Sequence, residues 1–408
     1  GLDIRFGESS DFCQASQHAD ELFSYIPDMN KGRPCSVSGL YPVENSNEHP
    51  VIKKRIFKKG EKIFRHFENK FISDVFIPEV NNKDLCFFHN VNADDIADGV
   101  AGAKAIGNRN RWAIISMDGN DMGQQFRHQV AQDNPNKLSG EDLLDWIRCM
   151  SKALDNCSNR AATSGIQKVV STWADSVEGK NLIENGGEIV LPIRPLVVGG
   201  DDIVILCHCS YAMLFVKEAV REFEAVSKNT PELWPATNGR LTITAGVLYA
   251  PVTLPLHLAI PYSEALLASA KTRGRRLMQV GEASPACIDY EQITDTVIDT
   301  PAAKRQRELY FSDVELDRKV KLTQRPYTLD DFKIVEDLAA KYKQVPATIR
   351  HKILPALSKS YAERLGFYAE IKKNHNDTLF KDLNEFRDEI DRLSSEPVDE
   401  SVSNEKTQ

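Results

Sequence analysis

The sequence predicts an α+β fold built on a ferredoxin-like β-α-β-β-α-β core, with a small mixed region before it and a helical region after it. Short apolar, β-branched runs alternate with helical patterns from residue 111 onward. Two of these runs, residues 196–198 and 203–206, flank a Gly-Gly-Asp-Asp tetrapeptide, which is typical of a hairpin. The order of the elements then matches this core.

The first expected strand covers residues 112–117 and is followed by Asp118. A helix is expected to begin after Ser139, because Ser139 and Asp142 have the spacing of a capping box and apolar residues then recur at helical intervals. After the hairpin, the same criteria predict a helix, a strand, a second helix and a short last strand, at residues 211–226, 241–248, 262–271 and 287–289.

The chain divides into regions of different composition. Residues 1–110 are mixed and contain a basic run at residues 53–59, which indicates either a nucleic-acid contact or a solvated helix face. Residues 111–300 contain the predicted core and form the expected catalytic domain. Residues 301–395 carry amphipathic helical patterns, and the polar, acidic residues 396–408 are expected to be disordered.

Composition argues against several classes of protein. The 408 residues have a formal net charge of -8, so the chain lacks the overall basic field of a protein that coats nucleic acid. No apolar run is long enough to span a bilayer, and the polar, acidic first residues are not those of a signal peptide. The eight cysteines form no CxxC pair, and a chain of this length needs no disulfide framework, which favours a reducing cytoplasm.

The turn Gly199-Gly200-Asp201-Asp202 is the most informative segment of the sequence. Adjacent carboxylates between two apolar strands are unfavourable for folding, because like charges repel and burial disfavours the charged form. A bound divalent cation removes this conflict, since Mg²⁺ prefers oxygen ligands. The alternative interpretation is an ordinary hairpin turn, in which Gly and Asp are common.

Asp118 favours the metal-binding interpretation. In the predicted fold the first strand lies beside the hairpin, so Asp118, Asp201 and Asp202 are expected to converge at one end of the sheet. Two Mg²⁺ or Mn²⁺ ions held by these aspartates would activate an attacking hydroxyl and stabilise a leaving phosphate. The three aspartates are therefore the candidate catalytic and metal-binding residues.

The loop that follows Asp118 is a candidate for binding a triphosphate. Its backbone N–H groups would cradle phosphates if a helix begins directly after it. The glycines of the hairpin turn would let a bulky substrate approach the backbone closely. Asp121 is equally well explained by loop solvation or helix capping. The candidate nucleotide-binding residues of the two segments are Gly119, Asn120, Asp121, Gly123, Gly199 and Gly200.

A basic cluster ends the helix expected at residues 262–271. Lys271 and Arg275 belong to the dense group of cations in the expected catalytic domain, and a site that handles phosphate needs cations. The alternative is that the helix dipole alone favours basic residues at a helix C-terminus. We expect Lys271 to neutralise triphosphate charge and Arg275 to contribute less.

Four segments resemble a known family in their order and spacing: residues 118–123, 199–202, 243–246 and 263–271. They look like the second palm domain of the large polymerase-like subunit of type III CRISPR effector complexes and, more remotely, like the GGDEF diguanylate cyclases. The resemblance covers residues 111–289. It implies synthesis of a cyclic oligoadenylate or a cyclic dinucleotide from ATP or another nucleoside triphosphate, with metals on the aspartates, in antiviral signalling.

The sequence departs from that family in several places. It contains no His-Asp dipeptide, so the family's nuclease domain is not expected, and no earlier palm domain is expected before residue 111. Asn120 stands where the family usually has a carboxylate. A segment resembling a CxxCG zinc knuckle has Ser38 in place of its second cysteine, which makes four-ligand zinc doubtful. The other candidate zinc ligands are Cys13, His18, Cys35 and Cys86.

Three functions are compatible with these features. The leading hypothesis is an enzyme in which the 3′-hydroxyl of one bound nucleoside triphosphate attacks the α-phosphate of another. The second is a catalytically inactive palm-domain scaffold, nucleotide sensor or RNA-binding subunit of an RNA-guided defence complex. The third, a template-dependent polymerase, is disfavoured because no extended basic groove is evident. The expected partners are nucleoside triphosphates, RNA or protein subunits of such a complex, and a second copy of the chain, but no membrane.

Overall fold

A computed structural model describes residues 33–34, 42–43, 70–78, 80–81, 85–87, 111–130, 137–185, 189–230, 240–251, 254–279, 282–294, 299–313, 318–321, 323–344, 346–357, 366–367 and 369–370. The basic run at residues 53–59, the tail at 396–408 and all the candidate zinc ligands except Cys86 lie outside these residues. The chain forms two compact units, Gly1–Phe67 with His89–Asn92 and Glu68–Phe88 with Ala93–Gln408. In the first unit, β1 (Arg33–Pro34) pairs antiparallel with β2 (Pro42–Val43).

The second unit contains a six-stranded mixed sheet. Its strands are β4 (Arg111–Gly119), β6 (Ile193–Gly199), β7 (Asp202–His208), β8 (Ile243–Pro251), β9 (Cys287–Gln292) and β12 (Tyr327–Thr328). They lie in the order β12-β9-β8-β4-β7-β6. All neighbours pair antiparallel except β8 and β9, which are parallel. Pro195 lies in β6, an edge strand, where a missing backbone N–H is tolerated.

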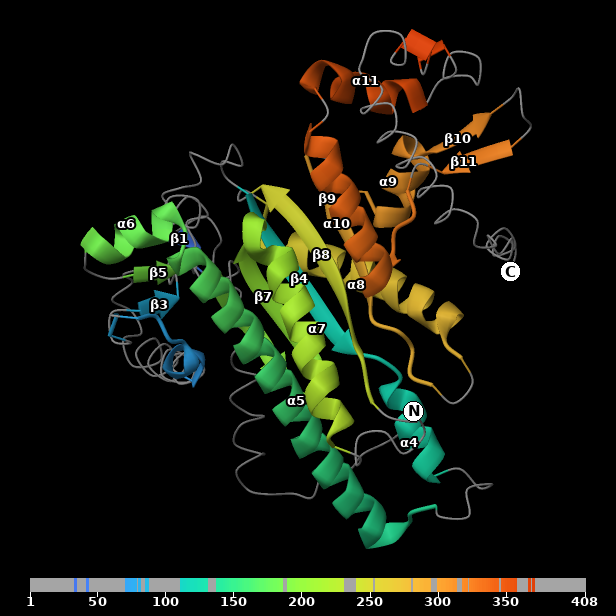
Figure 1. The fold of residues 1–408 in the computed structure, drawn as a ribbon. Helices are drawn as coiled ribbons and strands as arrows, with labels where there is room; N and C mark the ends of the chain where they lie inside the picture. Colours follow the sequence, from blue (N-terminus) through green and yellow to red (C-terminus); the bar gives the residue numbers. More distant parts are fainter. Residues whose placement is uncertain are drawn as a thin grey trace. The chain divides into compact units, whose positions relative to one another are not determined.

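Strands β4, β6, β7 and β8 form the predicted ferredoxin-like core together with α5 (Gly140–Ala174) and α7 (Ala212–Lys228). Figure 1 shows α5 and α7 side by side over one face of the sheet. Their buried residues recur at helical spacing and supply most of the apolar core on that face. The predicted fold class is therefore confirmed.

Helix α8 (Leu256–Leu277) packs against β8, β4 and β9. The Ser263 hydroxyl of α8 lies 2.6 Å from the hydroxyl of Ser116 on β4. The neighbours of Ser116 along the strand, Ile115 and Met117, point to the opposite face because side chains alternate. The sheet is thus covered by α8 on one face and by α5 with α7 on the other.

Shorter elements complete the second unit. They are β3 (Leu85–Phe87), α4 (Met122–Val130), α6 (Val177–Asn185), β5 (Ile189–Leu191), the 3₁₀-helix η3 (Cys209–Tyr211), α9 (Pro301–Glu308), β10 (Tyr310–Asp313), β11 (Arg318–Lys321), α10 (Leu329–Gln344) and α11 (Ala347–Leu357). Strand β3, which contains Cys86, pairs parallel with β5, and β10 pairs antiparallel with β11. Within the described ranges, no helix has both the length and the apolar character needed to cross a membrane.

Three expectations from the sequence need correction. Ser139 is the N-cap residue of α5, but its side chain makes no capping hydrogen bond. The helix expected at residues 262–271 begins earlier, at Leu256, and contains Pro261. The region after residue 300 is not purely helical, because β10, β11 and β12 lie among its helices. Strand β12 exists through pairing with β9, a tertiary contact for which two residues carry no sequence signal.

A buried ion cluster joins β9 to the segment after it. Arg305 of α9 donates two hydrogen bonds to the Asp289 carboxylate, at 2.6 and 2.9 Å, and its Nε lies 3.3 Å from Glu291. Arg325 contributes a second guanidinium 3.3 Å from Glu291. These side chains are at most 12% exposed, so the carboxylates are both buried and paired. The charges of this cluster are balanced inside the protein.

Candidate functional site

The strand pairing brings the three predicted aspartates together at one edge of the sheet. Asp118 lies near the end of β4, and Asp202 is the first residue of β7. The recorded pairing of these strands ends at Met117 and Ile203, so Asp118 and Asp202 lie one residue beyond it on adjacent strands. Asp201 precedes Asp202 in the hairpin turn, and its carboxyl group lies close enough to that of Asp118 for the two to interact.

The environment of Asp201 and Asp202 disfavours the charged forms of their two carboxylates. Burial raises the pKa of Asp201 to about 6, and the hydrogen bond and charge of Asp118 act in the same direction. Burial also raises the pKa of Asp202 above its ordinary value, the charge of Asp118 adds to this effect, and the charge of Lys271 opposes it. For Asp202, burial and the charge of Asp118 therefore outweigh the opposing charge of Lys271.

Lys271 of α8 reaches this edge from the face of the sheet that α8 covers. Its ammonium group pairs with the Asp118 carboxylate and also donates a hydrogen bond to the Gly119 carbonyl, at 2.9 Å. The helix comes this close because β8 has a glycine beneath it: a Cβ atom at Gly246 would lie 2.3 Å from a backbone oxygen of α8. From the sequence, Lys271 was expected to face a triphosphate, and its ion pair with Asp118 was not predicted.

The side chains of Asn120 and Asp121 hold the loop after β4 in place. Asn120 is buried, and its amide donates to the hydroxyls of Thr242, at 2.8 Å, and Thr244, at 2.9 Å. Asp121 has a positive φ of 60°, and its carboxylate accepts a hydrogen bond from the backbone N–H of Ser284, at 2.8 Å. These contacts give both residues a structural function, whatever their part in nucleotide binding.

The remaining candidates border open space. Gly123 lies in the first turn of α4, directly after the aspartate loop. A Cβ atom at Gly123, Gly199 or Gly200 would meet no other heavy atom within 4 Å. A ligand therefore has room beside the helix N-terminus and the hairpin turn. Arg275 is exposed and lies one turn beyond Lys271 on α8.

The donor set of this edge fits a divalent cation. Three carboxylates supply oxygen ligands, and a bound cation would stabilise the charged form of Asp201, which burial and the neighbouring Asp118 disfavour. In the part of the chain that the structure describes, no group of three or more His, Cys, Asp or Glu side chains is already arranged around a common ion position. In this structure the Lys271 ammonium is paired with the Asp118 carboxylate, and a bound metal ion would replace it as the partner of that carboxylate.

No pattern in the sequence predicted that a residue of α5 would support the hairpin turn. The Ser158 hydroxyl, which is fully buried, donates to the carbonyl of Gly200 at 2.6 Å. A serine in the middle of a long helix has no local signal, because its partner depends on how the helix lies on the hairpin. The same holds for Thr242, Thr244 and Ser284, whose partners come from a distant loop.

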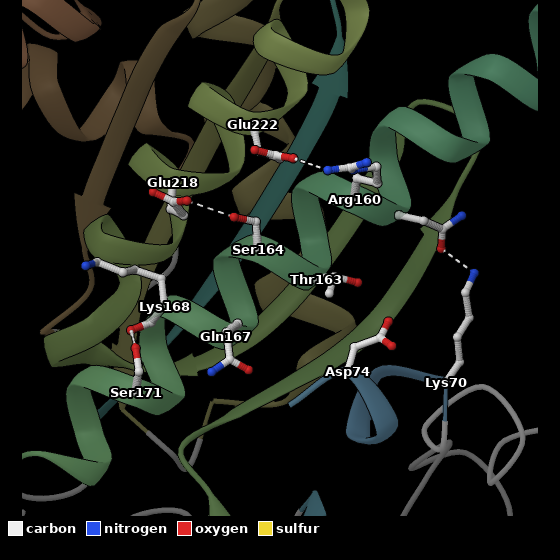
Figure 2. Close-up of a pocket in the computed structure, with 11 residues that line it drawn as sticks. Lys70, Asp74, Arg160, Thr163, Ser164, Gln167, Lys168, Ser171, Glu218 and Glu222 are labelled. Atoms are coloured by element: carbon white, nitrogen blue, oxygen red, sulfur yellow. Dashed lines mark hydrogen bonds and ion pairs between the residues drawn. The ribbon is translucent and has the colours of Figure 1, made fainter. Parts of the chain in front are cut away.

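A hollow of about 550 Å³ lies away from the aspartates, between α5, α7 and the segment that begins at Lys70. Figure 2 shows its wall, in which Arg160 pairs with Glu222 and Ser164 donates to Glu218. These polar groups satisfy one another, and the hollow is widely open to solvent. The aspartate edge therefore remains the better candidate site on chemical grounds.

Comparison with protein families supports the resemblance seen in the sequence. Residues 111–278 match the family model described as Cas10/Cmr2, second palm domain. This segment contains the three aspartates and Lys271. The suspected relation to the second palm domain is thus confirmed for this part of the chain. No curated protein matches the chain.

Solved structures of three kinds are similar to the chain at low identity. A Csm1-Csm4 cassette in complex with cA4 is 19% identical over 40% of this chain and 20% of that one, with a TM-score of 0.25. Csm1 from T. onnurineus is 15% identical over 61% and 32%, with a TM-score of 0.29. The GGDEF domain of DgcB from Caulobacter crescentus, in complex with c-di-GMP, is 14% identical over 47% and 85%, with a TM-score of 0.23. The similar region thus spans about a fifth of the cassette chain, and likenesses this distant carry no functional conclusion.

Proposed function

We propose that residues 111–300 form a nucleotidyltransferase of the palm type that makes a cyclic nucleotide or oligonucleotide from ATP or another nucleoside triphosphate. The observation that carries this proposal is the convergence of Asp118, Asp201 and Asp202 on one edge, with charge that the protein leaves largely uncompensated. The match of residues 111–278 to a second palm domain supports it. Participation in antiviral signalling, beside protein or RNA subunits of a defence complex, is part of the same proposal.

The residues of the edge have separate roles in this proposal. Asp118, Asp201 and Asp202 hold two Mg²⁺ or Mn²⁺ ions, which when bound supply charge neutralisation and activation of a hydroxyl. The first turn of α4, with Gly123, presents backbone N–H groups to the triphosphate. Lys271 moves from Asp118 to the triphosphate when the substrate binds. The 3′-hydroxyl of one nucleotide then attacks the α-phosphate of the other, forms a phosphodiester bond and displaces pyrophosphate.

The test is incubation of the purified chain with each labelled nucleoside triphosphate and Mg²⁺ or Mn²⁺, followed by separation of the products. We expect a cyclic product together with pyrophosphate, and the labelled base that is consumed identifies the substrate. Linear products that grow only on an added template would support a polymerase instead. No turnover of any triphosphate, with or without added RNA, would contradict the proposed reaction.

One observation favours a second candidate, a catalytically inactive palm domain that serves as a scaffold or nucleotide sensor. The ion pair between Lys271 and Asp118 already satisfies one of the three carboxylates without a metal. If that pair persists when triphosphate is present, the edge cannot assemble a two-metal site. Binding of ATP without product, measured by calorimetry in the presence of Mn²⁺, would distinguish this scaffold from the enzyme.

A further inference from the structure

The turn that carries Asp201 is held from behind by α5. Ser158 lies in the middle of this helix, is fully buried and donates its hydroxyl proton to the Gly200 carbonyl at 2.6 Å. No backbone hydrogen bond of the helix requires this serine side chain. This hydrogen bond therefore connects the middle of the helix to the tip of the hairpin.

The conformation of the turn makes this contact significant. Gly199 pairs with Asp202, so Gly200 and Asp201 are the two central residues of the turn. Gly200 has a positive φ of 60°, and Asp201 is not among the residues with positive φ. Positive φ at the first central residue alone is the pattern of a type II′ turn, whereas a type I′ turn needs it at both. The two turns differ mainly in the orientation of the peptide that joins the central residues.

That peptide contains both the Gly200 carbonyl and the Asp201 N–H. Because a peptide unit is planar, fixing the carbonyl also fixes the direction of the N–H. This N–H also faces the carboxylate of Asp201 itself and acts to lower the pKa of that group. A continuous path thus runs from the Ser158 hydroxyl through one rigid peptide plane to the carboxylate of Asp201.

We propose that Ser158 is a positioning residue that orients the Asp201 carboxylate for metal binding by holding the Gly200–Asp201 peptide in one of its two orientations. This inference rests on the proposed function, because it assigns a task to a residue behind the same edge. Without the hydroxyl, the Gly200 carbonyl loses its donor and the peptide is free to flip. The carboxylate then no longer points in one direction when the metal arrives.

Apolar contacts hold α5 in place without this hydrogen bond. Its neighbours Cys157, Ala161 and Ala162 are fully buried, and the helix packs along α7 and β6. Removal of one hydroxyl should therefore leave the fold intact. This separation between fold and turn makes the inference testable.

The experiment compares Ser158→Ala with a matched control, Ser164→Ala, in the full chain. Ser164 lies on the same helix and donates to Glu218 of α7 at 2.7 Å, away from the turn. Mn²⁺ binding is followed by electron paramagnetic resonance, and kcat and KM are measured for the triphosphate that turns over. For Ser158→Ala we expect Mn²⁺ affinity and kcat to fall about five- to tenfold, the loss of one hydrogen bond, with KM little changed.

Ser158→Thr, which keeps the hydroxyl, should recover part of the lost Mn²⁺ affinity if it folds. The control Ser164→Ala should bind Mn²⁺ like the unaltered protein. Equal Mn²⁺ affinity and equal kcat in Ser158→Ala and the unaltered protein would overturn the inference. An equal loss in both alanine variants would also overturn it, because the effect would then come from α5 as a whole.

A failure of the proposed function has a different signature. If the unaltered chain neither binds Mn²⁺ nor forms product, the proposal that the aspartates bind metal is wrong. Amide hydrogen exchange then tests whether Ser158 positions the turn. Ser158→Ala should then still accelerate exchange at Asp201 at least about fivefold relative to Ser164→Ala, since one hydrogen bond is lost. An unchanged exchange rate at the Asp201 amide would also show that Ser158 does not fix the orientation of the Gly200–Asp201 peptide.

Discussion

Two groups of acidic side chains in the same sheet have opposite surroundings. On β9, Asp289 and Glu291 are buried, and the guanidinium groups of Arg305 and Arg325 neutralise them at hydrogen-bonding distance. At the edge formed by β4 and β7, three aspartates converge, and Lys271 supplies the ion pair recorded for them among the described residues. Both groups lie within one packed unit, but they differ in exposure as well as in compensation, because Asp118 and Asp201 are partly buried and Asp202 is exposed.

The difference shows how a functional carboxylate cluster is distinguished from a structural one. A buried acid that meets its own arginine contributes to the stability of the fold, and its removal leaves a partner charge unpaired. An acid whose pKa is raised, as for Asp201, has a charged form that its surroundings disfavour and that a bound cation would stabilise. Mutations in the two groups should therefore have opposite effects on stability and on ligand binding.

The largest expected effect comes from Asp201→Ala combined with Asp202→Ala. Loss of both carboxylates should abolish product formation, because the metal ions lose their ligands. The melting temperature in the absence of metal should stay the same or rise, since repulsion with Asp118 is removed. Product analysis and circular dichroism check the two parts of this prediction.

The matched control is Glu141→Ala combined with Asp142→Ala, an adjacent acidic pair that is exposed in the first turn of α5. This control should retain full activity. Near-normal turnover in the variant of the hairpin aspartates would show that they do not hold the catalytic metals.

The second effect concerns the compensated cluster. Arg305→Met should destabilise the fold by about 3–5 kcal/mol, because it leaves buried carboxylates without their main partner. Urea denaturation measures this as a lower midpoint at unchanged slope. Mn²⁺ affinity of the protein that remains folded should not change. The control Arg307→Met, on the exposed side of the same helix, should leave the midpoint unchanged.

A truncation of the chain would also test the compensated cluster on β9, because it removes several of its residues together. Removal of the chain after residue 300 would delete Arg305 and Arg325 together with β12, which is a strand of the same sheet. A domain boundary at residue 300 stays a prediction, and the pairing of β9 with β12 is what any truncation there must break. A cut after residue 357 preserves all of these contacts and is the better starting point.

The third effect is a change in affinity that has opposite signs for the triphosphate and for Mn²⁺. Lys271→Ala should weaken triphosphate binding by about one to two orders of magnitude, since a charge-assisted contact contributes roughly 1.5–3 kcal/mol. The same variant should bind Mn²⁺ more tightly in the absence of nucleotide, because Asp118 is freed from its ion pair. Calorimetric titrations with ATP, adenosine and Mn²⁺ measure all three affinities.

Adenosine, which has no phosphates, should bind the unaltered protein and Lys271→Ala equally. Arg275→Ala, one turn further along α8, is the matched control and should have a smaller effect on ATP. If ATP and adenosine lose affinity equally in Lys271→Ala, the lysine supports the fold and does not face the triphosphate.

The smallest expected effect concerns a buried histidine, whose Nδ1 accepts a hydrogen bond from the Ser210 backbone N–H at 3.3 Å. His208 lies at the end of β7 opposite to Asp202, and its Nε2 makes no hydrogen bond. Burial lowers the pKa of this histidine below 6.5. The unfolded chain then binds the proton first on acidification, so stability should fall as the pH drops below 6.5. In His208→Gln this loss should be smaller, as measured by urea midpoints at pH 5 and pH 7.5; an identical loss in both proteins would contradict the assignment.

The sequence predicted the core of the fold because its signals are local and strong. The β-branched runs that became β4, β7 and β8, and the Gly-rich turn between β6 and β7, form the expected elements. The placement of Asp118 beside Asp201 followed from topology, since the first strand of this fold lies next to the hairpin.

The contacts that complete the site depend on the register of the strands and on where each helix lies along the sheet. No local sequence pattern predicts either of these. The ion pair of Lys271, the bond from Ser158 to Gly200 and the bond from Ser284 to Asp121 join residues far apart in the chain. Strand β12 was missed for the same reason. A sequence can show which carboxylates converge, but not which of them already has a partner.

The absence of a side chain at Gly246 lets α8 lie close enough to the sheet for Lys271 to reach Asp118. Helix α8 and strand β8 touch backbone to backbone at Gly246, where a Cβ atom would lie 2.4 Å from the Leu267 nitrogen. Four residues of helix, a rise of about 6 Å, lead from Leu267 to Lys271. Two residues of β4, about 6.8 Å, lead from Ser116 opposite Gly246 to Asp118. The helix and the strand advance by nearly equal steps, so any side chain at position 246 would lift the lysine from its aspartate together with the helix from the sheet.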